Sequence, residues 1–262
     1  MEEKAEGHVR FWFENYDGIP VDPWQRDKIN RIRKVGRQLK VDSLGGVELQ
    51  TNWALVRAEH RLEELLRTES AGRVAVGINT HERITKRQQG GTCIATFGLL
   101  ATYRTTTGHD PSGLGRWTSL RIEGKDGRVS RLVSAYIPCR SQKGRYTTVY
   151  AQHRWWLWKQ GDSRCPRKAA RDNLLSAISE WRANNERIVL YCDHNESARR
   201  GILARGLRRA GLLDGLLARN PNLSETNTWY RGRIQIEAVW VSDDIDVTAC
   251  GLLPFGLGAG DH

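Results

Sequence analysis

Residues 190–197 read LYCDHNES and place an acid, a histidine and an amide directly after a short apolar run. Where a buried strand ends, the rigid strand and the turn beyond it hold polar side chains at the solvent boundary. Asp and Asn are also common turn residues, so this motif alone predicts a turn and a reactive site equally well. Asp193 could deprotonate or orient a water molecule, whereas Asn195 can only form hydrogen bonds, because an amide does not titrate.

Five further polar groups fall where other strand-like runs end. They are Asn15 with Asp17, Glu48, Tyr136, Glu237, and Asp261 with His262. Because whole elements separate them, the pattern indicates one site assembled from many loops. Carboxylate and amide oxygens suit Mg²⁺ or Mn²⁺, and such a metal polarises a phosphoryl oxygen and neutralises charge in the transition state. A histidine oriented by a carboxylate can stabilise the phosphoryl charge. The set therefore predicts phosphodiester hydrolysis.

The elements that must position these groups are strands mixed with helices. Strand-like runs cover residues 8–13, 73–78, 92–97, 117–122, 131–137, 187–191 and 237–242. Asp126-Gly127 marks a hairpin turn between the fourth and fifth run. Helical patterns cover residues 21–40, with Asp22 as N-cap and Pro23 as first helical residue, and residues 52–67 and 166–183. Hairpins combined with helices of this kind predict an α+β sandwich of packed sheets covered by helices.

Composition limits the class of protein. The chain has 262 residues without an internal repeat or a long linker, so residues 1–262 are predicted to form a single domain. No apolar run reaches membrane-spanning length and the start does not read as a signal peptide, so no membrane partner is expected. Five scattered cysteines without a CxxC pair favour an intracellular, reducing compartment, nuclear or cytoplasmic, and argue against a structural zinc site.

Charge is the most informative part of the composition. The chain carries 41 Lys and Arg against 30 Asp and Glu, a formal net charge of +11. A basic surface of this size favours a polyanionic partner, of which nucleic acid is the commonest. The excess consists mostly of arginine, which suits bidentate contacts to phosphate.

The order of the motifs resembles the endonuclease/exonuclease/phosphatase superfamily, which includes DNase I and the exonuclease III type of abasic-site endonucleases. The matching stretches, in chain order, are NYDG, VELQTNW, AYIP, DHN, IEAVWVS and GDH. They cover essentially the whole chain, and six motifs in order are far more specific than any one of them. DPSGLGRW, RYTTVYAQHR, NTWYRG and LLPFG further look like endonuclease domains of retroelements. The resemblance implies a four-layer α/β-sandwich, with two packed mixed β-sheets flanked by helices.

The resemblance also implies a metal centre of Mg²⁺ or Mn²⁺. Glu48 would be its principal ligand, with Asn15 and Asp17 nearby and Asp261 beside the metal. A longer polyprotein with a reverse transcriptase is the context that the likeness to retroelements implies.

The remaining roles concern the phosphate and the attacking water. By resemblance, Asp193 would activate the water and Asn195 would position it. Tyr136 would contact the scissile phosphate, and His262 would bind it with Glu237 behind the imidazole. In this reading the DHN motif activates the nucleophile.

Five features depart from the family's pattern. Cys192 and His194 stand where the family has Gly and Phe, and the thiol is expected to crowd the site. Glu237 replaces an Asp, which adds one methylene behind the imidazole. Gly260 replaces a Ser. The chain stops at His262 although the family continues into a last strand, so the domain is expected to be truncated at its C-terminus.

The leading hypothesis is a divalent-metal-dependent endonuclease that cleaves DNA. One alternative is a catalytically degenerate, nucleic-acid-binding remnant of the same fold. Another is a phosphatase acting on a small or lipid phosphoester, which explains the charge of +11 less well. Neither the choice between DNA and RNA nor the oligomeric state follows from the motifs.

The motif QHRWWLWKQ at residues 152–160 interleaves basic residues with Trp155, Trp156 and Trp158. One interpretation is a ridge that stacks on bases and binds phosphates. The other is a half-buried helix, on which at least one of the three indoles belongs to the core.

Overall fold

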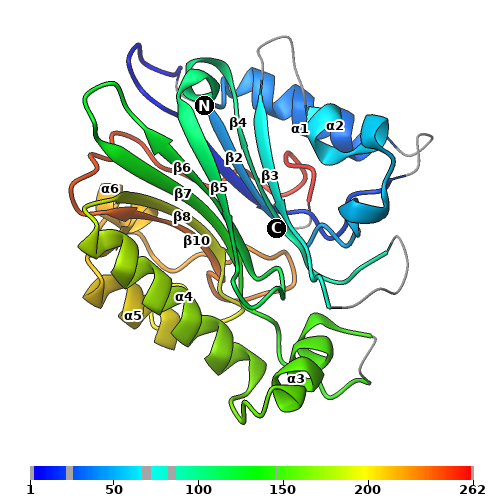
Figure 1. The fold of residues 1–262 in the computed structure, drawn as a ribbon. Helices are drawn as coiled ribbons and strands as arrows, with labels where there is room; N and C mark the ends of the chain where they lie inside the picture. Colours follow the sequence, from blue (N-terminus) through cyan, green and yellow to red (C-terminus); the bar gives the residue numbers. More distant parts are fainter. Residues whose placement is uncertain (1–2, 22–25, 67–71, 82–86, 145–146, 261–262) are drawn as a thin grey trace.

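Two β-sheets packed face to face form the centre of the molecule, and helices cover their outer faces (Figure 1). The computed structural model describes residues 3–21, 26–66, 72–81, 87–144 and 147–260. This four-layer α+β sandwich, with two mixed sheets, confirms the predicted fold class.

The first sheet has four strands. Their order is β1 (Phe11–Asn15), β2 (Ser43–Val47), β4 (Thr92–Thr96) and β3 (Arg73–Gly77). β1 and β2 are parallel, and the other neighbours are antiparallel. Helices α1 (Asp27–Gln38) and α2 (Leu62–Leu66) cover its outer face, where Ile29, Ile32 and Leu62 pack against Trp12 and Leu44.

The second sheet has six strands. Their order is β5 (Arg104–His109), β6 (Trp117–Glu123), β7 (Val129–Tyr136), β8 (Arg187–Asp193), β10 (Glu237–Ser242) and β9 (Leu212–Asp214). Only β7 and β8 are parallel among these described strands. The outer face is covered by α4 (Pro166–Ala183) and α5 (Ile202–Arg209). The further helices are α3 (Val149–Lys159), α6 (Gly215–Arg219) and the 3₁₀ helices Trp53–Leu55, Ala58–His60 and Gly98–Thr102.

The described helices and the cysteines bear on the environment expected for the protein. In this part of the chain, none of the helices has both the length and the apolarity needed to cross a bilayer. All five cysteines are free thiols.

Glycines in β2 let the two sheets approach closely. A Cβ added to Gly45 would lie 2.5 Å from the ring of Tyr191, which projects from β8, and one added to Gly46 would overlap the ring of Tyr16. Gly45 and Gly46 therefore make room for two aromatic rings in the core. The same glycines explain why β2 is not predicted from the sequence, because SLGGV has few of the β-branched and aromatic residues that are typical of a strand.

The seven predicted strands and the helix over residues 166–183 are present, but other predictions need correction. β2, β5 and β9 were not predicted. The helix predicted over residues 52–67 is wrong, because 3₁₀ turns separated by extended residues precede α2. Burial of Trp53 and Val56 in the core turns Leu55 to solvent, so tertiary packing overrides helical periodicity. The first helix begins at Asp27, and the predicted cap at residues 22–23 lies outside the described residues.

Two glycine-to-alanine substitutions are expected to change stability in opposite directions. Gly36, inside α1, lines a recess of about 200 Å³, and a Cβ there meets its nearest neighbour, Trp12, only at 4.0 Å. Gly36→Ala should therefore raise the free energy of unfolding by about 1 kcal/mol. Gly45→Ala should lower it by ~1–3 kcal/mol, because the methyl group overlaps Tyr191. Urea unfolding of both variants tests this, and equal effects would contradict it.

Candidate functional site

Asn15 and Asp193 join the two sheets at the edge where β1 and β8 end. Both side chains are buried, and Nδ2 of Asn15 donates a hydrogen bond to Oδ2 of Asp193 at 3.1 Å. Side chains alternate along a strand, so these two point between the sheets, as do Phe13 and Tyr191 two positions earlier. The rings of Phe13 and Tyr191 stack with centroids 6.0 Å apart. The polar pair therefore closes one end of the shared core.

Asn195 fixes the carboxylate of Asp193 from the loop that follows β8. Its backbone N–H donates to Oδ1 at 2.8 Å, and its Nδ2 donates to Oδ2 at 3.3 Å. The same Nδ2 donates to the carbonyl oxygen of Ile137 at 2.9 Å, which ties this loop to the end of β7. Both oxygens of Asp193 are thus held by directed donors, as a group that must act on one substrate atom requires.

Tyr136 and Glu48 form a second hydrogen-bonded pair beside the first. Tyr136 ends β7 directly opposite Asp193 in the register, and its phenol donates to Glu48, which follows β2. Burial raises the pKa of Tyr136 well above its ordinary value, and the charges of Glu48 and Asp193 raise it further. The phenol therefore stays protonated and remains a hydrogen-bond donor next to two carboxylates.

Glu237 completes the group from β10. It lies opposite Asp193 in the antiparallel register, and directly opposed side chains project from the same face of a sheet. The side chain is buried, and its backbone N–H donates to Oγ1 of Thr228 at 3.2 Å. Five elements thus bring together six of the nine residues singled out from the sequence: Asn15, Glu48, Tyr136, Asp193, Asn195 and Glu237.

The other three residues of the expected metal and phosphate site are placed differently. Asp17 is exposed, and its carboxylate accepts a hydrogen bond from Nε2 of Gln50 at 2.7 Å. Its backbone N–H donates to Oδ1 of Asn15 at 3.0 Å. Asp261 and His262 lie outside the described residues. Within the described ranges, no group of three or more His, Cys, Asp or Glu side chains is arranged to hold a metal ion.

Backbone conformations mark the same region. The described chain has six non-glycine residues with positive φ, and four of them surround the site: Asp17 (43°), Glu48 (53°), Gln50 (52°) and Asn195 (47°). This conformation is sterically strained for a non-glycine residue, and residues with such strain cluster at functional sites. The strain is thus concentrated on the loops that carry Glu48 and Asn195.

Glu14 is a site neighbour that sequence reasoning missed. It is buried on β1, and its Oε1 accepts a hydrogen bond from the backbone N–H of Gly260 at 2.7 Å. Burial raises its pKa to about 7, and the nearby charge of Glu237 adds to the shift. The only signal in the sequence is a charged residue inside the apolar run FWFEN. A Cβ on Gly260 would overlap the carbonyl oxygen of Asn15, which accounts for glycine where the family has serine.

The expectation that Cys192 crowds the site is wrong. Alternation along β8 turns its side chain away from Asp193, into the core beneath α4 and α5. There it packs with Leu190 and Trp240, and burial raises the pKa of the thiol well above its usual value. A small apolar thiol suits this position, so Cys192 is part of the scaffold.

Arg167 on α4 is a second residue that sequence reasoning missed. Its guanidinium is buried and donates to the carbonyl oxygens of Pro138 at 2.9 Å and His194 at 3.1 Å, and it pairs with Glu196 at 3.2 Å. These contacts hold together the loops that follow β7 and β8. An arginine in the first turn of an amphipathic helix carries no sequence signal for this role.

His194 is buried and neutral. Its Nε2 accepts a hydrogen bond from Nε1 of Trp240 at 2.9 Å, which offsets part of the cost of burying an imidazole where the family has Phe. Burial lowers the pKa of His194 to about 3, and the charges of Arg167 and Arg208 contribute to the shift. The residue therefore acts as a hydrogen-bonded core side chain.

This shift predicts a dependence of stability on pH. The unfolded chain binds a proton at His194 below about pH 6.5, whereas the folded protein does so only near pH 3. The neutral imidazole of His194 therefore contributes fully to the free energy of unfolding above about pH 6.5, and this contribution is lost as the pH falls toward 3. When the pH is lowered from about 7 to about 5, the free energy of unfolding should fall by ~2 kcal/mol less for His194→Phe than for the unsubstituted protein. Glu14 titrates in the opposite sense but is common to both proteins, so equal pH slopes would contradict the prediction.

The architecture is similar to that of several solved structures, although sequence comparisons find no match. No protein-family model and no curated protein matches the sequence. The 3′ phosphatase NExo from Neisseria, bound to a product DNA hairpin, has a TM-score of 0.58 at 13% identity, over 89% of this chain and 86% of that chain. An AP endonuclease from Archaeoglobus fulgidus has a TM-score of 0.56 at 13% identity, over 90% of this chain and 87% of that chain.

A third solved structure carries the family name in its description. It is an endonuclease/exonuclease/phosphatase from Beutenbergia cavernae DSM 12333, with a TM-score of 0.59 at 13% identity, over 97% of this chain and 68% of that chain. These likenesses confirm the resemblance inferred from the motifs at the level of architecture. The chain has the fold of the endonuclease/exonuclease/phosphatase superfamily.

Proposed function

We propose that the protein is a divalent-metal-dependent phosphodiesterase that cleaves DNA as an endonuclease, of the type carried by retroelements. The observation that carries the proposal is the Asp193 carboxylate, held by Asn15 from the first sheet and by Asn195 from the loop after β8, beside the Tyr136–Glu48 pair. Proteins of similar fold described as a 3′ phosphatase with a DNA hairpin and as an AP endonuclease support this class of chemistry.

The residues present fit a hard divalent cation. Glu48 and Asp193 supply carboxylate oxygens close to one phenol, and Mg²⁺ is commonly bound through one or two carboxylates together with waters and substrate phosphates. The lack of a three-ligand cluster in the described residues is compatible with such a site. Glu48 would hold the metal, with Asn15 and Asp17 nearby. When bound, the metal would polarise a phosphoryl oxygen.

The chain's own groups account for the rest of the reaction. Asp193 would accept a proton from the attacking water, and Asn195 would keep that carboxylate aimed at it. The protonated phenol of Tyr136 would donate a hydrogen bond to a phosphate oxygen as charge builds there. The placement of His262 beside the phosphate, with Glu237 behind it and Asp261 next to the metal, is part of the proposal.

The partner follows from charge. A net charge of +11 favours a nucleic acid over a small phosphoester. A polyprotein that also contains a reverse transcriptase, acting in a reducing intracellular compartment, is the proposed context. A second candidate, nucleic-acid binding without cleavage, is favoured by the buried Glu14, whose carboxyl lies within electrostatic reach of the lengthened side chain of Glu237.

Incubation with supercoiled plasmid tests the proposal. The protein is expected to convert plasmid to the nicked form with Mg²⁺ or Mn²⁺, and EDTA should abolish the reaction. Affinity for a labelled duplex should fall steeply with salt. Tight, salt-sensitive binding without nicking in either metal would favour the second candidate. A flat response to salt together with hydrolysis of a small phosphomonoester would favour a phosphatase.

A further inference from the structure

Helix α3 begins directly behind the site. Its first residue, Val149, packs with Tyr136 and with Val47, the residue before Glu48. At a rise of ~1.5 Å per residue, Trp158 lies about 14 Å along the helix from Val149. That length corresponds to about four steps of a nucleic-acid strand at ~3.4 Å each. Four nucleotides are therefore long enough to span the distance from a phosphodiester at Tyr136 to the outer end of α3.

The three tryptophans of α3 have different surroundings. Trp156 is half-buried and stacks on the exposed His81 with ring centroids 3.5 Å apart. None of the three indoles is among the buried core residues, so the prediction that at least one of them belongs to the core is wrong. Trp155 lies under the ammonium of Lys159, which is 3.8 Å from the ring centroid. Trp158 is 71% exposed, so neither the core nor a packing partner accounts for its large apolar ring.

Basic residues flank the exposed indole. Arg154 and Lys159 are exposed, and each is a helix neighbour of an indole four residues away, because Arg154 precedes Trp158 by four residues and Lys159 follows Trp155 by four. The four residues Arg154, Trp155, Trp158 and Lys159 are called here the α3 ridge. Residues 137–161, which run from the site through the ridge, contain no Asp or Glu and five Lys or Arg. This stretch is complementary in charge to a phosphate backbone.

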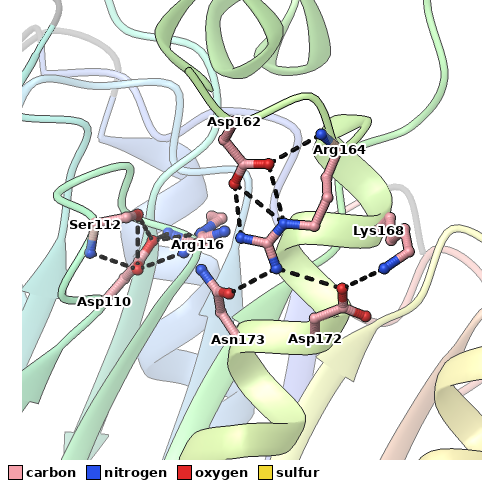
Figure 2. Close-up of polar contacts among 8 residues, drawn as sticks. All are labelled: Asp110, Ser112, Arg116, Asp162, Arg164, Lys168, Asp172 and Asn173. Atoms are coloured by element: carbon pink, nitrogen blue, oxygen red, sulfur yellow. Dashed lines mark hydrogen bonds and ion pairs between the residues drawn. The ribbon is translucent and has the colours of Figure 1, made fainter. Parts of the chain in front are cut away.

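Polar contacts join the loop that follows α3 to helix α4 (Figure 2). Arg164, just after α3, donates to Asp162 at 2.6 Å and to Asp172 and Asn173 of α4 at 3.3 Å each. On the other side, Nε2 of His81, which stacks on Trp156, donates to the carbonyl oxygen of Ser112 at 2.6 Å. These contacts anchor α3 at its C-terminal end and at Trp156, and an anchored helix loses little conformational freedom when a base stacks on it.

We propose that the α3 ridge is a stacking platform for unpaired bases of the nucleic-acid strand that enters the site. Trp158 stacks on a base, while Arg154 and Lys159 contact the neighbouring phosphates. The inference rests on the proposed function, because it assumes that the scissile strand lies at Tyr136. It adds that the substrate has a single-stranded segment next to the cleaved bond.

Binding of a short labelled oligothymidylate in EDTA tests the ridge without cleavage. Trp158→Ala should weaken binding about tenfold, and Trp158→Phe, which keeps an aromatic face, should stay within about threefold of the unsubstituted protein. Leu99→Ala is the matched control, because Leu99 is 73% exposed and follows β4 at the end of the sheet away from Glu48. A fully paired hairpin should lose less than about twofold with Trp158→Ala.

Two outcomes would overturn the inference: no measurable binding of the oligonucleotide by the unsubstituted protein, or equal oligonucleotide affinity of the unsubstituted protein and Trp158→Ala. If the affinities are equal and Trp158→Ala also loses binding to phosphatidylserine vesicles, the ridge belongs to a membrane surface. Hydrolysis of bis(p-nitrophenyl) phosphate separates the two proposals. If neither the unsubstituted protein nor Trp158→Ala hydrolyses it with Mg²⁺ or Mn²⁺, the proposed chemistry fails. If both hydrolyse it equally and Trp158→Ala binds the oligonucleotide more weakly, the result supports the ridge.

Discussion

Replacing Asp193 with asparagine is expected to reduce DNA nicking by about 10³-fold while the protein stays folded and still binds DNA. The amide has nearly the shape of the carboxylate, and its oxygen can still accept the hydrogen bond that Asn195 donates from its backbone. It cannot take a proton from water, so the loss falls on the chemical step. Plasmid nicking measures activity, and fluorescence anisotropy of a labelled duplex in EDTA measures binding.

The matched control is Asp126→Asn, in the exposed hairpin turn between β6 and β7. It makes the same chemical change away from the site and should leave nicking unchanged. Nicking by Asp193→Asn within about tenfold of the unsubstituted rate would remove Asp193 from the proposed mechanism. Loss of duplex binding together with nicking would indicate a structural role instead.

The convergence of the site was predictable because strand ends carry a strong signal. Asn15, Tyr136 and Asp193 each terminate a run whose periodicity predicts a strand, and sheet topology brings such ends together. Glu48 was identified from its motif, although its strand was not, because Gly45 and Gly46 remove the usual composition of a strand.

What escaped the sequence depends on contacts between distant segments. Arg167 bonds two carbonyl oxygens from loops that follow different strands, and nothing near it in the chain marks this. The alternation of side chains along β1 predicts an apolar core residue at the position of Glu14. The backbone N–H of Gly260, which hydrogen-bonds its carboxylate, comes close only in the folded chain. The face that Cys192 presents has a local cause instead, because alternation along β8 turns its side chain to the face opposite Asp193.

Asp110→Ala is expected to destabilise the protein by ~3–5 kcal/mol, the largest effect on stability foreseen here. Asp110 and Arg116 are both buried, and the guanidinium donates to the two carboxylate oxygens at 2.6 and 2.8 Å (Figure 2). Burial alone would raise the pKa of Asp110, but the hydrogen bonds and charge of Arg116 outweigh it, and the pKa lies below its ordinary value. Removing the carboxylate leaves a buried, uncompensated charge.

Two comparisons isolate that cause in urea unfolding. Asp126→Ala breaks the pair with Arg128, whose side chains are 47% and 67% exposed, and should cost less than ~1 kcal/mol. The double variant Asp110→Ala with Arg116→Met should recover part of the loss, because it removes the stranded charge. A loss below about 1 kcal/mol for Asp110→Ala, or a double variant less stable than the single one, would contradict this account. The loop from Asp110 to Arg116 also contains Ser112, whose carbonyl oxygen holds His81 against Trp156, so its unfolding should loosen α3 as well.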